Sequence, residues 1–75
     1  MKFTAILKKD VETGLYVAWC PDVDVASQGK SIEEALSNLK EALELYFEDE
    51  DAEYPSGDLF VSIIEIQPKK VGIQV

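Results

Sequence analysis

Cys20 is the residue of this chain whose side chain could most directly act as a nucleophile, and it lies between Trp19 and Pro21. A cysteine nucleophile needs a base within hydrogen-bonding distance, usually histidine, and the 75 residues contain no histidine. We therefore favour a small packed side chain at the end of a strand over a reactive thiol at this position.

Carboxylates are the other groups that could carry chemistry, through a bound metal ion. A metal-dependent nuclease needs several of them converging from different strands. Only Asp22 and Asp24 lie near a predicted strand, and no acidic residue occurs between Met1 and Lys9. A single cysteine and no histidine exclude a zinc site of the Cys/His type and a disulfide within the chain. The sequence therefore predicts no enzyme activity, no metal site and no cofactor.

Acidic side chains dominate the charge of the chain. Fifteen Asp and Glu against seven Lys give a net charge of −8, and there is no Arg. Nucleic-acid-binding proteins carry basic surfaces, because neutralising phosphates supplies much of their affinity. Direct binding of DNA or RNA is therefore not expected. The acidity can serve solubility alone, or it can attract a basic protein partner.

The hydropathy of the chain indicates no membrane segment. No run approaches the roughly 18 apolar residues of a membrane span, and the first ten residues lack the core of a signal peptide. A lone cysteine needs no partner in a reducing compartment, so we expect a cytoplasmic protein.

Several regular elements must position these groups. The patterns predict strands at 2–9, 15–20 and about 25–29, a helix at 32–48 and a strand at 59–66. The helix signal is the strongest, because Ser31 and Glu34 form a capping box ahead of an apolar stripe with helical spacing. The segment 71–75 also alternates, and it could pair within the chain or with a partner's edge.

These elements predict one α+β domain over residues 1–75 with the order β-β-β-α-β. Short connections make the first three strands an antiparallel meander, and the helix can cross one face and deliver the last strand parallel to the first. One helix covers one face, so the other face would be a large apolar patch on a monomer. We expect a second copy to cover it in a homo-oligomer, either a dimer or a tetramer. The residues expected at that interface are Ile6, Tyr16, Ala18, Cys20, Val71 and Ile73.

The stretch 14–48, "GLYVAWCPDVDVASQGKSIEEALSNLKEALELYFE", resembles the HicB-like antitoxin family. The family pattern is an aromatic, alanine-containing strand, then Pro-Asp, a short segment ending in Gln-Gly, and a capped helix of the Glu-Ala-Leu type. The chain lacks the Leu-Pro-Gly-Cys turn that many members carry after Pro-Asp. Contacts of that turn are therefore not carried over. Many members also append a DNA-binding domain, and we expect none here, so we do not expect autonomous repression of DNA.

The resemblance implies a degraded ribonuclease-H-like fold and a role as an antitoxin. Such an antitoxin binds HicA, a small basic toxin that cleaves mRNA, and masks its active site. We therefore expect the acidic surface to meet a basic toxin. The residues expected to contribute are Asp22, Asp24, Glu48, Asp49, Glu50 and Asp51.

Other functions stay open at this point. The run from Glu48 to Glu53 is also consistent with a solvated helix end that binds nothing, because carboxylates repel the negative end of the helix dipole. The chain could instead be an orphan regulatory or scaffold module that binds another protein. A relic nuclease is the third and least favoured hypothesis.

Overall fold

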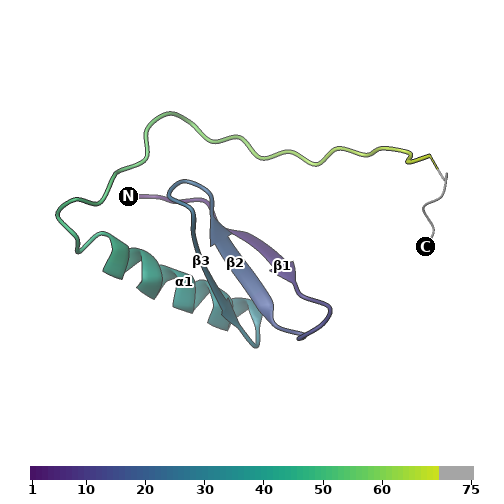
Figure 1. Cartoon of the computed structure of the whole chain (residues 1–75), viewed down its shortest axis with the longest axis horizontal. Coiled ribbons are helices and arrows are strands. Elements are labelled where there is room, and N and C mark those ends of the chain that lie inside the picture. Colours follow the sequence, from purple (N-terminus) through teal and green to yellow (C-terminus); the bar gives the residue numbers. More distant parts are fainter. Residues whose placement is uncertain (70–75) are drawn as a thin grey trace.

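The structure is a computed structural model and describes residues 1–69. Strands β1 (Ile6–Lys9) and β2 (Tyr16–Cys20) form an antiparallel hairpin in which Leu7 lies opposite Ala18. Aromatic and β-branched residues suit β2, because they pack well on a pleated surface. β2 is the central strand of the sheet (Figure 1).

Asp10 holds the loop between these two strands. Its Oδ2 accepts hydrogen bonds from the Thr13 hydroxyl at 2.7 Å and the Thr13 N–H at 3.3 Å. The bond from the Thr13 hydroxyl is the largest of several effects that lower the pKa of Asp10 below its ordinary value. Gly14 follows with φ +76°, a conformation that glycine adopts without steric cost, and the chain re-enters the sheet.

Strand β3 (Val25–Gly29) completes the sheet on the other side of β2. It pairs antiparallel with β2, with Tyr16 opposite Gly29 and Cys20 opposite Val25. The strand order is therefore β1-β2-β3. The three-stranded antiparallel meander predicted from the sequence is confirmed.

Helix α1 (Ile32–Tyr46) begins where the capping box predicts. The Ser31 Oγ accepts a hydrogen bond from the Glu34 N–H at 3.0 Å. The Glu34 carboxylate accepts from the Lys30 N–H, one residue before the expected Ser31 N–H. The helix ends two residues earlier than predicted, at Tyr46, and its last turn holds no basic residue to favour the negative end of the dipole.

α1 lies across one face of the sheet, closest to β3 and then to β2 (Figure 1). The buried hydrophobic residues are small or aliphatic: Ala18 and Cys20 on β2, and Ala35 and Leu39 on α1. Half-buried apolar residues surround this core, namely Phe3, Leu7, Tyr16, Val23, Val25 and Leu43. Small side chains on both surfaces let the helix approach the sheet closely.

The prediction that Ala18 and Cys20 line an interface between copies is wrong, because α1 buries both of them completely within one chain. Tyr16 alternates with them on the same strand and also packs against this core. The sequence could not settle which side of β2 the helix covers, because β2 is apolar on both sides. The other side, here called the open face, carries Val17 and Trp19 on β2, with Ile6 opposite Trp19. Val71 and Ile73 lie outside the described residues.

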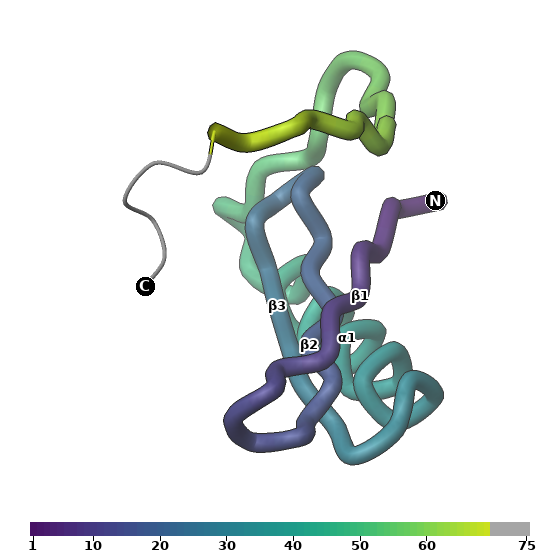
Figure 2. Tube along the Cα trace, turned by 90° about the vertical axis from the view of Figure 1, so that its right-hand side faces the viewer, coloured from purple at the N-terminus to yellow at the C-terminus, as the bar shows by residue number. Residues whose placement is uncertain are grey.

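The expected last strand does not join this sheet. Residues 58–69, here called the arm, run clear of the sheet and pair with none of its three described strands (Figures 1 and 2). The α+β class is confirmed, and the described part of the chain has the order β-β-β-α. The ribonuclease-H-like relationship, which needs the additional strand, stays a prediction.

Gly29 fixes the distance between the end of β3 and the start of α1. A Cβ atom at this position would lie 2.6 Å from the Ala35 backbone nitrogen and within 2.9 Å of two Glu34 atoms. Real Cβ atoms do not approach other atoms so closely, and the nearest atoms belong to the backbone and cannot rotate away. A side chain at position 29 would therefore push the helix from the sheet.

We predict that Gly29→Ala destabilises the protein by about 1–3 kcal/mol, the usual cost of overpacking a core. Urea unfolding followed by Trp19 fluorescence measures the change. Gln28→Ala is the matched control, because Gln28 neighbours Gly29 on β3 and its side chain is exposed. Equal stabilities for the two variants would contradict the close approach.

Candidate functional site

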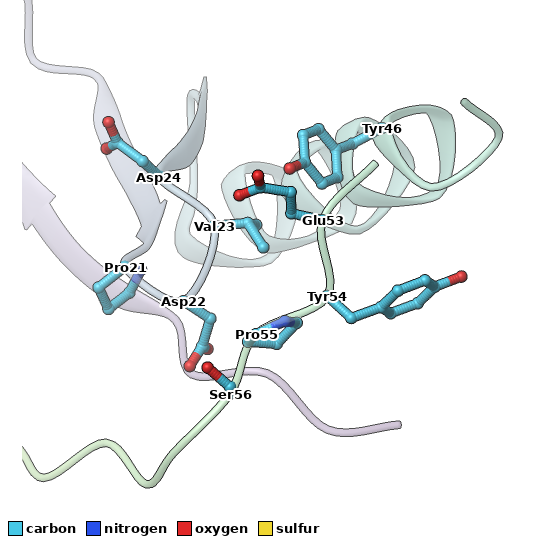
Figure 3. Close-up of a pocket in the computed structure, with 9 residues that line it drawn as sticks. All are labelled: Pro21, Asp22, Val23, Asp24, Tyr46, Glu53, Tyr54, Pro55 and Ser56. Carbon is cyan, nitrogen blue, oxygen red and sulfur yellow. The ribbon is translucent and has the colours of Figure 1, made fainter. Parts of the chain in front are cut away.

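An open hollow of about 410 Å³ lies where the β2–β3 corner meets the chain that returns after α1 (Figure 3). The corner contributes the segment 21–24, and the returning chain contributes the segment 53–56, together with Tyr46 from the end of α1. Three carboxylates line it, from Asp22, Asp24 and Glu53. The hollow therefore combines a negative charge with aromatic and proline surfaces.

Stacked aromatic rings bring the returning chain to this place. The Phe47 ring stacks on Phe3 with centroids 5.3 Å apart, and on Tyr54 with centroids 4.9 Å apart. Tyr46 meets Phe47 edge-on at 4.8 Å. Such pairs stabilise beyond their buried area. They tie the segment after α1 to the N-terminal segment, so Glu53 comes to lie beside the corner.

The Asp22 carboxylate is an internal hydrogen-bond acceptor. Its Oδ2 accepts the Thr4 N–H at 2.9 Å and the Cys20 thiol at 3.5 Å. These bonds fasten the segment before β1 to the corner after β2. Asp22, predicted to contact a partner, therefore has a structural role that the sequence did not reveal, because its partner is 18 residues away.

The Asp24 carboxylate is also engaged within the chain. Its Oδ1 accepts the indole N–H of Trp19 at 2.8 Å. Asp24 has φ +56°, in the left-handed region that aspartate enters more readily than most residues. The corner turns there, and the Asp24 carboxylate points away from those of Asp22 and Glu53 (Figure 3). Within residues 1–69, no group of three acidic, cysteine or histidine side chains could hold a metal ion.

The other predicted acidic residues form an exposed turn directly after α1, here called the acidic turn (residues 48–51). The Glu48 N–H donates to the Leu45 carbonyl at 3.1 Å, and the Asp51 N–H donates to the Asp49 Oδ1 at 2.9 Å. The turn leads within two residues to Glu53 in the hollow. The structure thus places the predicted pair Asp22 and Asp24 and the acidic turn at the same end of the molecule. Glu53, which belongs to the acidic run 48–53 but was not predicted to contact a partner, also lies there.

Cys20 lies in the core beneath α1, and burial raises the pKa of its thiol above the ordinary value. A protonated, enclosed thiol is a poor nucleophile. The packed side chain favoured from the sequence agrees with this position.

A second hollow, of about 360 Å³, lies on the open face and is mainly apolar. Its lining residues are Ile6, Lys8, Asp10, Val17 and Trp19. It holds Ile6, the one described residue of the predicted interface that lies on the open face. No helix within residues 1–69 is long and apolar enough to cross a membrane.

We predict that iodoacetamide modifies Cys20 slowly in the native protein and rapidly in urea. The rate should rise in parallel with unfolding, because the thiol becomes accessible and its pKa returns to the ordinary range. Cys20 is the single cysteine, so the mass of the whole protein reports its modification directly. Fast labelling of the native protein would show that the thiol is reachable from solvent.

We predict that Asp22→Ala destabilises the protein by about 1–2 kcal/mol, because the Thr4 N–H loses its acceptor. Asp22→Asn is the matched control, since its side-chain oxygen can still accept this bond. Urea unfolding followed by Trp19 fluorescence compares the two. If both variants are as stable as the wild type, the bond between Asp22 and Thr4 does not hold the N-terminal segment.

Similar proteins occur in bacteria and archaea. A UPF0150 protein of Synechocystis is 41% identical over 68 residues, which cover 85% of each chain. A UPF0150 protein of Archaeoglobus fulgidus is 36% identical over 72 residues, covering 89% of this chain and 97% of the relative. One from Helicobacter pylori is 50% identical over 54 residues, covering 71% and 72%.

No model of a protein family matches the chain, and no solved structure matches it either. Two of these relatives nevertheless cover 85% and 89% of the chain. The chain belongs to the UPF0150 family.

Proposed function

We propose that this protein is a non-catalytic antitoxin that binds and masks a small basic toxin of the HicA type. UPF0150 proteins are small HicB-like proteins, which agrees with the resemblance carried by residues 14–48. The observation that carries the proposal is the acidic turn: four consecutive carboxylates, all exposed, beside a hollow lined by three more.

The charges of the two proteins explain how masking would work. A toxin that cleaves mRNA must present a basic surface, because its substrate is a chain of phosphates. Carboxylates at the acidic turn compete with those phosphates for the same lysine and arginine side chains. Complementary charge also speeds association with the toxin, since it steers the two proteins together. An acidic protein of net charge −8 is suited to this task.

The chemistry of the described residues supports a binding role. Cys20 is enclosed by the core, and the carboxylates of Asp22 and Asp24 accept hydrogen bonds from the chain itself. The Asp22 and Asp24 side chains therefore shape the corner. The acidic turn is left as the main docking element, with Glu53 at its edge. We propose the cytoplasm, where mRNA is cleaved, as the compartment.

The test pairs the protein with the product of a small, basic reading frame beside its gene. The wild-type protein should co-purify with this product and protect RNA from cleavage. Glu48→Gln, Asp49→Asn, Glu50→Gln and Asp51→Asn together should weaken binding by about tenfold or more. They should also flatten its salt dependence, because four attractive charges are removed.

A control variant removes the same number of charges elsewhere on the surface. Glu12, Glu33, Glu41 and Glu44 are exposed and lie outside the acidic turn, so changing all four to Gln should have a smaller effect. Equal losses in the two variants would mean that net charge alone drives binding. A wild-type protein that neither binds the basic product nor protects RNA would refute the antitoxin proposal.

A further inference from the structure

The arm exposes large apolar side chains that a monomeric protein would normally bury. All residues from 58 to 69 are exposed, and the large apolar ones include Phe60 at 87% and Ile63 at 94%. The other exposed apolar residues of the arm are Leu59, Val61, Ile64 and Ile66. A patch of this length and hydrophobicity marks an interaction site.

The order of residues in the arm is that of a strand covered on both sides. Leu59, Val61 and Ile63 alternate with Phe60 and Ser62, and Ile64 and Ile66 continue the second set. A half-buried strand alternates apolar with polar residues, whereas this segment is apolar on both faces over most of its length. Its partner must therefore supply both hydrogen bonds along an edge and apolar cover on two faces.

β1 is the edge of the sheet that can accept another strand. Among the described residues, only β2 pairs with β1, so its outer edge is free. The opposite edge, β3, is closest to α1, and the Gln28 carbonyl on it already accepts the Asn38 amide at 2.8 Å. A free edge is a template for strand addition from another chain.

Charge favours the same pairing. Lys8 and Lys9 lie on β1, and Lys2 lies just before it. The arm carries Asp58 and Glu65 near the two ends of its apolar run. In a chain of net charge −8, the β1 edge is the basic strip, and opposite charges on neighbouring strands stabilise their pairing.

The arm would gain little by folding back onto β1 of its own chain. α1 packs on β3 and β2, so a strand outside β1 would lie beyond the cover of the helix. Both apolar faces of the arm would then stay exposed to water. The base of the arm is also held, because Tyr54 stacks on Phe47 and the segment 53–56 lines the hollow. Gly57 follows with φ +83°, a conformation that glycine adopts without steric cost.

We infer that two copies of this chain exchange their arms. The segment 58–66 of each copy adds to the outer edge of β1 in the other copy. The open face at Ile6, Val17 and Trp19, with Trp19 40% exposed, lies next to that edge in the same sheet, so it forms one continuous apolar surface with one face of the added arm. The body of the second copy, which a monomer lacks, supplies the cover for the arm. This inference is independent of the proposed toxin binding.

Sedimentation of the full chain at micromolar concentration tests the exchange. The wild-type protein should have the mass of two 8.4 kDa chains, or a multiple of two. Ile63→Asp places a charge in the buried centre of the exchanged strand and should weaken association by at least about 30-fold. Circular dichroism should show that the body stays folded, because the arm packs on none of its own core.

Val11→Asp is the matched control. Val11 is an aliphatic residue that is 91% exposed, close to the 94% of Ile63, but it lies in the hairpin loop away from the arm. This variant should sediment like the wild type. A monomeric wild-type protein, or a dimer that Ile63→Asp leaves intact, would overturn the inference.

Mixed isotope labelling separates exchange from every other kind of dimer. Labelled and unlabelled chains are unfolded together, refolded and examined by isotope-filtered nuclear Overhauser spectroscopy. Contacts between the arm of one chain and β1 of the other are expected across differently labelled chains. Contacts between the arm and β1 only within one chain would show that the arm folds back, and the exchange would be refuted.

Discussion

The close approach of α1 to the end of β3 is the constraint on which the rest of the fold depends. A side chain at position 29 would collide with the Ala35 backbone, so only glycine fits there. Ala18 and Ala35, which are small, then meet in the core together with Cys20 and Leu39. A helix held this near the sheet buries one face of a three-stranded meander with few large side chains.

Aromatic packing builds the candidate binding end at the other end of α1. α1 ends at Tyr46, and Phe47 packs between Phe3 and Tyr54. This stack turns the chain back toward the corner and leaves the acidic turn exposed on the outside. The Asp22 carboxylate holds the N-terminal segment against the same corner. Acidic side chains far apart in the sequence are thus gathered by aromatic packing, and not by attraction for one another.

The three strands and one helix of residues 1–69 have little surface with which to cover a fourth strand. α1 spans β3 and β2, and the hydrophobic core stops at about the level of β1. The arm, with apolar residues on both faces, exceeds what this body can bury. Small domains often gain the missing burial from another chain. The basic charge of β1 and its outer edge, which is unpaired among residues 1–69, favour a second copy of the chain as the source of this burial.

The sequence by itself determined the local elements of this protein. Alternation predicted β1 and β3, aromatic and β-branched composition predicted β2, and the capping box at Ser31 predicted the start of α1, because these signals act between residues close in the chain. It also identified the acidic residues and excluded a Cys/His metal site. The prediction for Cys20 followed from the absence of histidine, and the buried position of Cys20 agrees with it.

Only the tertiary structure decided which face of β2 lies under the helix, because both faces are apolar and periodicity cannot distinguish them. It also decided that Asp22 and Asp24 bond within the chain, since Thr4 and Trp19 come near them only after folding. The local sequence pattern also could not show whether the expected last strand joins the sheet of its own chain. A strand-like sequence indicates that a segment needs a strand edge to pair with and apolar residues to cover its faces. The size of the folded body decides whether the same chain can supply both.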